Sequence, residues 1–349
     1  MRKFLIFILL AGVLVSGCVI RFGNSRAPAL AGVFKSFDQG NNWVQKNLFL
    51  HSGGSGSIGG INVIDLTFDP QDNRALYLTA DGAGLLYSYD GADSWLKANQ
   101  VGNGRIEAVA IDPKNKCVIY ASFANTVLKS VDCNRTWAEV YIDTRPDKAI
   151  TALAVDYFNN LAVYAANSAG DLLKSTDAGS TWRVINRFND RVAKILIDLN
   201  DTRIIYVATK SKGIFKTTDA GISWFDFNDG LKQYSGAFEY KNLIFDHTLP
   251  NALLLVAKYG LLKTIDGGQT WQPITLLTPP ATTDIFSVAI NPQDNKQIYY
   301  ATASTFYKTV DAGQNWITKR LPTGAIATVL LIDPIDPRII YLGLSNPSR

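Results

Sequence analysis

Metal-binding residues and charged residues are both scarce in this sequence. Its 349 residues include two histidines, three cysteines and one methionine, which is the initiator. His51 and His247 lie far apart, and no Cys-x-x-Cys, His-x-His or His-Glu-x-x-His pattern occurs, so we expect neither a metal site nor a cofactor. Only 18% of the residues are charged, and the formal net charge is +4. A net positive charge this small does not indicate that the protein binds nucleic acid.

No segment after the N-terminus is apolar for long enough to span a membrane. At the N-terminus itself, Arg2 and Lys3 precede an apolar run over residues 4–15. A bilayer-spanning helix needs about 20 residues, so this run is too short to span but is typical of an export signal. We therefore predict that the chain is exported from the cytoplasm.

The export signal ends at a cysteine. The sequence Val15-Ser16-Gly17-Cys18 places small residues directly before a thiol, and it resembles the lipobox of bacterial lipoproteins. That resemblance implies cleavage before Cys18 and acylation of its thiol, with stable anchoring by more than one acyl chain. An ordinary signal peptide with a chance cysteine is the alternative. The lipoprotein interpretation makes 1–17 the signal peptide and 18–30 a lipidated tether, with the rest on the extracytoplasmic side of the cell membrane.

Tryptophan is confined to one repeated motif. All seven tryptophans end an octapeptide that begins with Ser or Thr and carries Asp at its third position. Successive tryptophans are 42 to 52 residues apart, which is the period of a four-stranded β-propeller blade. The Asp and Trp residues of the seven copies are Asp38 and Trp43, Asp90 and Trp95, Asp132 and Trp137, Asp177 and Trp182, Asp219 and Trp224, Asp266 and Trp271, and Asp311 and Trp316.

The octapeptide resembles the BNR/Asp-box repeat, whose pattern is Ser/Thr-x-Asp-x-Gly-x-Thr/Ser-Trp. This resemblance covers the chain from about residue 31 to its end. It implies a turn in which the Asp carboxylate accepts backbone N–H groups and the Trp starts the next strand, so we interpret the copies as structural rather than as seven ligand sites. Two copies have Ala92 and Asn134 at the glycine position. Asn tolerates a left-handed backbone but Ala does so poorly, which suggests that Gly91 takes that role one residue earlier.

The segments between the octapeptides fit four strands per repeat, which we call A to D from the channel outward. Runs of β-branched and aromatic residues between turn signals favour strands, and no window shows sustained helical periodicity. The first copy starts at strand C over 32–36, whereas the C-terminus supplies strand A over 326–332 and strand B over 339–344. We therefore predict an all-β, seven-bladed propeller over 31–349, with its first blade completed from both chain ends. An open or six-bladed array is the alternative.

The two faces of such a ring differ in sequence. The A–B turns and the octapeptides share one face, the octapeptide face, and the B–C turns and D–A connections share the other, the connection face. The longest D–A connections lie over 51–60, 226–238 and 275–283, and the first is rich in Gly and Ser. Aligned A strands place six charged residues at the channel mouth on the connection face: Arg105, Glu107, Arg191, Glu239, Lys241 and Asp284. We expect either a solvated ring of paired charges or a polar binding site for a peptide or glycan.

The chain is similar to the photosystem II stability/assembly-factor type of Asp-box propeller, which implies a scaffold that binds an extracytoplasmic protein. Asp-box propellers also include sialidases and xyloglucanases, so a glycoside hydrolase or a glycan-binding protein is the alternative. Hydrolysis needs two carboxylates about 5–9.5 Å apart, and Glu107, Glu239 and Asp284 are candidates. No local motif singles out a pair, and the Arg-Ile-Pro motif of sialidases is absent. We favour a monomeric binding propeller without catalytic activity.

Two cysteines remain in the exported part. Cys117 opens strand B of the third repeat, Cys133 lies just past strand C, and the turn between the strands falls near 123–125. Neighbouring positions on antiparallel strands suit the Cα separation of about 4.4–6.8 Å that a disulfide needs. An oxidising compartment permits the bond, so we predict a Cys117–Cys133 disulfide.

Overall fold

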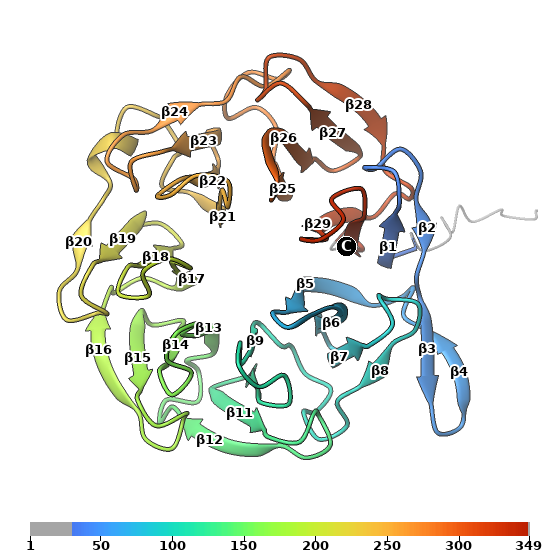
Figure 1. Cartoon of the computed structure of the whole chain (residues 1–349), viewed down its shortest axis with the longest axis vertical. Helices are drawn as coiled ribbons and strands as arrows, with labels where there is room; N and C mark the ends of the chain where they lie inside the picture. The colour runs from blue at the N-terminus through green and yellow to red at the C-terminus, as the bar shows by residue number, and fades with distance from the viewer. Residues whose placement is uncertain (1–29, 348–349) are drawn as a thin grey trace, which may run out of the picture.

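The computed structural model describes residues 30–347, and Figure 1 shows them as a ring of four-stranded antiparallel sheets around a central channel. Seven such sheets close the ring, each with its first strand beside the channel and its last strand on the outer rim. The described residues contain one short 3-10 helix, η1 (Asp229–Leu231). The prediction of an all-β, seven-bladed propeller is confirmed.

The blades are numbered here in the order of their octapeptides. The first three are β29 (Ile326–Ile332), β30 (Ile340–Ser345), β1 (Gly32–Ser36) and β2 (Val44–Gln45); β5 (Asn62–Asp69), β6 (Asp72–Asp81), β7 (Gly84–Ser88) and β8 (Leu96–Lys97); and β9 (Val109–Ile111), β10 (Ile119–Phe123), β11 (Thr126–Ser130) and β12 (Ala138–Ile142).

The remaining four blades follow the same order from the channel outward. They are β13 (Ile150–Val155), β14 (Val163–Asn167), β15 (Asp171–Ser175) and β16 (Arg183–Arg187); β17 (Val192–Ile197), β18 (Ile205–Thr209), β19 (Ile214–Thr217) and β20 (Phe225–Asp226); β21 (Tyr240–Phe245), β22 (Leu253–Ala257), β23 (Gly260–Thr264) and β24 (Gln272–Pro273); and β25 (Ser287–Asn291), β26 (Asp294–Ala301), β27 (Thr305–Thr309) and β28 (Ile317–Arg320). Every outermost strand begins one residue after its tryptophan, not at the tryptophan as expected.

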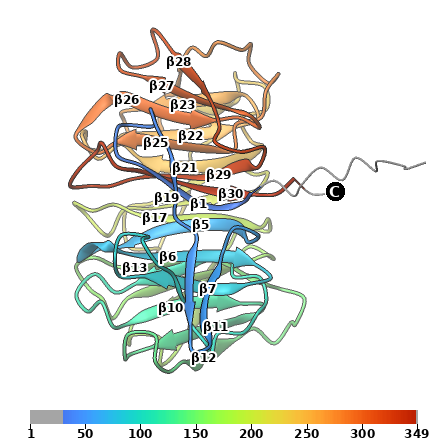
Figure 2. The ribbon, with the colours of Figure 1, turned by 90° about the vertical axis from the view of Figure 1, so that its right-hand side faces the viewer.

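Both chain ends complete the first blade, as predicted. β1 pairs with β30 in an antiparallel register that runs from Gly32 opposite Leu344 to Ser36 opposite Ile340. Because β1 starts where β30 ends, the described ends of the chain leave the ring together on the connection face, as the side view in Figure 2 shows.

The propeller has no single hydrophobic core. Its buried apolar residues form seven clusters, and each cluster lies between two neighbouring blades. Between the fourth and fifth blades, for example, Tyr164 and Leu172 share a cluster with Val192 and Ile205. A blade therefore buries its apolar surface only when both neighbours are present, which explains why the ring has to close.

The octapeptide turn is built from the same hydrogen bonds in every copy. In the fourth copy, the Ser175 hydroxyl accepts the N–H of Gly179 at 2.7 Å, and Asp177 accepts the N–H and the hydroxyl of Thr181 at 2.8 and 2.7 Å. The Thr181 hydroxyl and N–H bonds hold the pKa of Asp177 down at about 2. These bonds satisfy the turn internally, which agrees with a structural role for the motif.

The fourth and fifth octapeptide positions both have positive φ in all seven copies. We expected Gly91 to adopt the left-handed conformation in place of Ala92, and this was wrong. Both residues adopt it, with φ 76° at Gly91 and φ 71° at Ala92. The N–H of Ala92 donates to the Ser88 hydroxyl at 2.9 Å. This bond and the packing of Ala92 in an apolar cluster hold a backbone that alanine alone disfavours.

Lysines at the end of strand C join neighbouring blades, a role that the sequence analysis missed. Lys129 Nζ donates to the Ala178 carbonyl at 2.7 Å, and Lys174 Nζ donates to the Ala220 carbonyl at 3.0 Å. Each ammonium also lies over a strand-B tyrosine ring, 5.4 Å away for Lys129 over Tyr120. Burial lowers the pKa of both lysines. The repeated signal is the lysine directly before the octapeptide, which also occurs at Lys35, Lys216 and Lys308.

The Gly/Ser-rich connection after the first octapeptide is not an irregular loop. It contains a hairpin of β3 (Leu48–His51) and β4 (Gly54–Ser57), which stands out from the outer rim in Figure 1. The backbone around Leu48 and Leu50 exchanges hydrogen bonds of 2.8 and 2.9 Å with Trp95 of the second blade. Backbone pairing thus gives strand structure to a sequence whose composition favours a loop.

Candidate functional site

Three of the predicted residues meet at the channel mouth on the connection face. Arg105 Nε lies 2.8 Å from Glu107 Oε1, and Arg191 Nη2, from a connection two blades further on, lies 3.1 Å from the same oxygen. Arg105 also reaches Asp81, the last residue of β6 in the second blade, at 3.1 Å. These ion pairs join the second, third and fifth blades around one side of the mouth.

A second cluster lies on the sixth and seventh blades. Asp284 Oδ1 is 3.5 Å from Lys241 Nζ and 3.9 Å from Lys258 Nζ, and all three side chains are about half exposed. Glu239 is exposed, and its carboxylate forms no ion pair with any described residue. Five of the six predicted residues therefore form two separate ion-pair clusters, and Glu239 stands apart from both.

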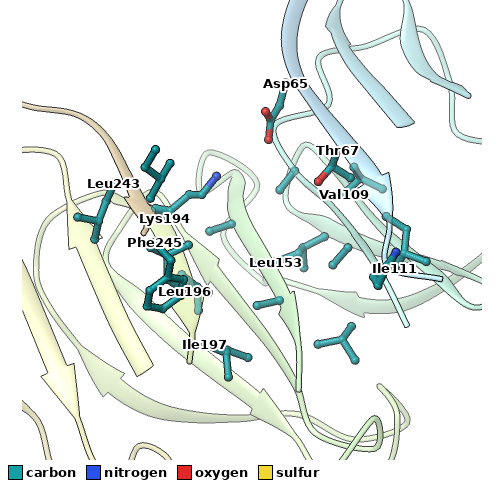
Figure 3. Close-up of a pocket in the computed structure, with 18 of the residues that line it drawn as sticks. Asp65, Thr67, Val109, Ile111, Leu153, Lys194, Leu196, Ile197, Leu243 and Phe245 are labelled. Carbon is teal, nitrogen blue, oxygen red and sulfur yellow. The ribbon is translucent and has the colours of Figure 1, made fainter. Parts of the chain in front are cut away.

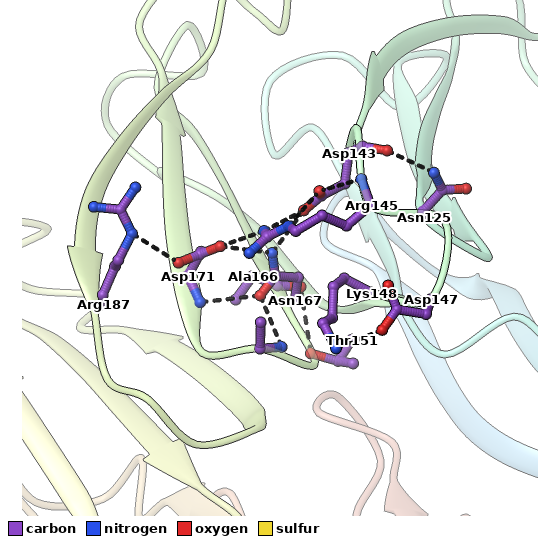
Figure 4. A network of polar contacts seen from close by, with 11 residues as sticks. Asn125, Asp143, Arg145, Asp147, Lys148, Thr151, Ala166, Asn167, Asp171 and Arg187 are labelled. Atoms are coloured by element: carbon purple, nitrogen blue, oxygen red, sulfur yellow. Dashed lines mark hydrogen bonds and ion pairs between the residues drawn. The ribbon is translucent and has the colours of Figure 1, made fainter.

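A buried carboxylate pair fixes the connection between the third and fourth blades (Figure 4). Asp143 and Asp171 have side chains only 3% and 7% exposed, and the Arg145 guanidinium bridges them. The Asn167 amide donates to both carboxylates, at 2.8 and 3.2 Å, and Arg187 pairs with Asp171 at 3.1 Å. The hydrogen bond from Arg145 holds the pKa of Asp143 below its usual value. This network makes part of the connection face rigid.

The A strands of the second to sixth blades line the central channel, which contains a cavity of about 360 Å³ (Figure 3). Its wall combines apolar side chains, among them Val109, Leu153, Leu196 and Phe245, with polar ones such as Thr67 and His247. At the end near the connection face the lining is charged: Glu107 belongs to the first ion-pair cluster, and Asp65 and Lys194 also line the cavity. Sequence alignment of the A strands did not single out Asp65 or Lys194.

The octapeptide face carries exposed apolar side chains that the sequence analysis did not predict. Several A–B turns expose large apolar side chains, among them Phe158 at 60% and Ile335 at 71%. The second octapeptide position adds exposed side chains such as Ile265 and Val131. Because the turn residues differ from blade to blade, this face also offers features that one partner could recognise.

Cys117 and Cys133 are joined as a disulfide, and the N–H of Cys133 donates to the carbonyl of Cys117 at 3.2 Å. Cys18 lies outside the described residues. Over 30–347 there is no helix long and apolar enough to cross a membrane, and no group of three His, Cys, Asp or Glu side chains is placed to hold a metal ion.

Comparison with protein-family models finds no match for this chain. A curated xyloglucanase from Hypocrea jecorina is 31% identical over an alignment of 167 residues, which covers 41% of this chain and 19% of the enzyme. The GH74 enzyme of Niastella koreensis superposes with a TM-score of 0.65 at 18% identity, over 81% of this chain and 51% of that chain. This chain thus spans about half the length of the solved enzyme and far less of the curated one.

In contrast to the GH74 enzyme, YCF48 is matched over nearly its whole length. The structure of YCF48 bound to a D1 peptide superposes with a TM-score of 0.62 at 14% identity, over 83% of this chain and 94% of that chain. YCF48 from Cyanidioschyzon merolae is similar over 95% of its length, at 12% identity and a TM-score of 0.62. At these identities the likeness establishes the fold: a seven-bladed propeller with structural neighbours among GH74 enzymes and YCF48 proteins.

Proposed function

We propose that the protein is a lipid-anchored, extracytoplasmic Asp-box propeller that captures a segment of a partner protein on its connection face, without catalysis. One observation carries this proposal: the channel mouth on that face is surrounded by charged side chains that come from several blades and follow no repeat. Non-repeated groups on loops held by a rigid scaffold are the usual place for specific recognition.

The position of the chain ends supports the same face. The described N-terminal end leaves beside β1 on the connection face. A tether from Cys18 to residue 30 would be at most about 45 Å long when extended. Lipidation at Cys18 would therefore hold the connection face near the membrane surface, where it could meet the extracytoplasmic part of a membrane protein. The match to the full length of a YCF48 structure with a bound peptide adds support.

A glycoside hydrolase is the second candidate, because the curated relative is a xyloglucanase. The carboxylates of the mouth are poorly arranged for that chemistry. Glu107 is engaged by two arginines and Asp284 by two lysines, so each would have to give up ion pairs before it could approach a glycosidic bond, and the two belong to separate clusters rather than to one catalytic pair. Release of reducing ends from xyloglucan by the purified protein, abolished by Glu239→Gln or Asp284→Asn, would favour the hydrolase.

Capture of a partner from native membranes tests the proposed function. The full-length anchored protein and an Arg105→Ala/Arg191→Ala variant are isolated under mild detergent, and the co-purifying protein is quantified. We expect the double variant to retain less than about one fifth of the partner, because it removes two cations at the mouth. Its thermal unfolding should change little, since exposed ion pairs contribute about 0–1 kcal/mol.

The matched control is Arg203→Ala/Arg338→Ala. These two arginines are exposed on the octapeptide face, and each pairs with an aspartate two residues earlier. This control should capture as much partner as the wild type. Equal capture by the wild type and the Arg105/Arg191 variant would refute the proposed face.

A further inference from the structure

Two charged side chains inside the channel have no ion-pair partner among residues 30–347. Asp65 on β5 and Lys194 on β17 line the cavity at the end where the mouth charges lie, and Figure 3 shows their side chains on opposite sides of the opening. Neither forms an ion pair with any residue of the described chain, and they do not pair with each other. The recorded hydrogen bond to the Asp65 carboxylate comes from the N–H of Leu66, at 2.9 Å.

A β-bulge in each strand sets the direction of these two side chains. The pairing of β5 with β6 shifts register between Val63 and Asp65, and the pairing of β17 with β18 shifts between Val192 and Lys194. Such a β-bulge re-orients the residue that follows it. The third and fourth blades have Ala108 and Ala152 at the equivalent lining positions. Two small side chains therefore separate the carboxylate from the ammonium and leave space between them.

Beyond this charged layer the lining contains no further Asp, Glu, Lys or Arg side chain of the described residues, and it combines apolar side chains with the polar groups of Thr67, Tyr157 and His247. Leu153, Leu196 and Phe245 form its apolar part, and the cavity of about 360 Å³ falls in the usual range of small-ligand sites. One end of the cavity thus presents a negative and a positive group across a gap, and the rest suits a hydrocarbon or aromatic group.

We infer that the channel binds a small zwitterion with an apolar side chain, of the amino-acid or dipeptide class. The ligand's ammonium pairs with Asp65, its carboxylate pairs with Lys194, and its side chain points down the channel. Charge-assisted hydrogen bonds of this kind are roughly twice as strong as neutral ones. This inference rests on the channel lining alone and does not depend on the proposed capture of a partner protein.

Calorimetric titration of the purified full-length protein tests the inference. The probes are L-phenylalanine and L-alanyl-L-phenylalanine, each compared with its N-acetylated form, which lacks the ammonium, and its C-terminal amide, which lacks the carboxylate. At least one zwitterion should bind saturably, and both blocked forms of it should bind at least tenfold more weakly. Absence of saturable binding by either zwitterion would overturn the inference.

Variants of Asp65 and Lys194 test whether these two side chains bind the zwitterion. Asp65→Asn and Lys194→Gln should each weaken the zwitterion at least tenfold, whereas Asp65→Asn should not change the weak affinity for the N-acetylated form. The double exchange Asp65→Lys/Lys194→Asp should recover binding, since the ligand can enter with its charges reversed. Asp229→Asn and Lys232→Gln are matched controls, because both residues are exposed in the 226–238 connection on the connection face and do not line the cavity. Equal weakening by the controls, or unchanged binding in both channel variants, would contradict the assignment.

Discussion

Replacement of Arg145 by methionine should destabilise the propeller at neutral pH. The guanidinium bridges two carboxylates, Asp143 and Asp171, that are almost completely buried. Removing one partner of a buried ion pair costs about 3–5 kcal/mol. Here the loss is smaller, because Arg145 is 45% exposed, Arg187 still reaches Asp171, and the Asn167 amide still donates to both carboxylates. We expect a loss of about 2 kcal/mol, or roughly 3 °C in Tm for a protein of this size.

The pH dependence of this loss has a definite sign. The side-chain hydrogen bond from Arg145 lowers the pKa of Asp143 in the folded protein. The stabilisation is therefore present above the unfolded pKa of about 3.9 and disappears as pH falls through the lower folded value. The difference in Tm between wild type and Arg145→Met should be largest near pH 7 and shrink toward pH 3.

Thermal unfolding followed by tryptophan fluorescence measures both effects. Arg187→Met is the matched control, because Arg187 is 67% exposed and pairs with Asp171 alone. Its loss should stay within about 1 kcal/mol. If Arg145→Met unfolds at the wild-type temperature at pH 7, or if Arg187→Met costs as much, the network does not stabilise the connection face as described.

Three further predictions concern the turns and the anchor. Ala312 is exposed with φ 60°, so Ala312→Gly should stabilise the protein by about 0.5–1 kcal/mol. Gly313→Ala should destabilise it, because the new Cβ would lie 2.5 Å from Ile274 Cγ2. Chemical denaturation measures both changes in the free energy of unfolding. Hydrogen bonds from Thr181 hold the pKa of Asp177 at about 2, so Asp177→Ala should lower Tm at pH 7 and reduce the further loss that the wild type shows between about pH 4 and pH 2. Cys18→Ser should abolish labelling by a fatty-acid analogue and release the protein from membranes; a variant that still fractionates with membranes would rule out the lipid anchor.

The architecture was predictable because its signals are local and repeated. Seven tryptophans at blade spacing indicate the number of blades, and the missing strands of the first copy indicate how the ring closes. The octapeptides and the four strands of each repeat recur at similar offsets, so each face could be assigned before any contact was known. The mouth charges were found in the same way, from the alignment of strand A copies.

The remaining features depend on contacts and strand registers that composition and spacing do not reveal. The bulges that aim Asp65 and Lys194 arise from register shifts between strands, and such shifts leave no mark on composition. The β3–β4 hairpin forms in a Gly/Ser-rich stretch because Trp95 supplies backbone partners. Ala92 adopts a left-handed backbone because the Ser88 hydroxyl and an apolar cluster compensate its cost.

Site-specific photo-crosslinking in native membranes tests most directly whether the connection face captures the partner. A photoreactive amino acid replaces Glu239, exposed on the connection face, in one variant and Phe158, exposed on the octapeptide face, in another. The proposed function predicts a discrete crosslinked partner from position 239, lost when Arg105 and Arg191 are both replaced by alanine, and none from position 158. A partner crosslinked from position 158 and not from position 239 would contradict it.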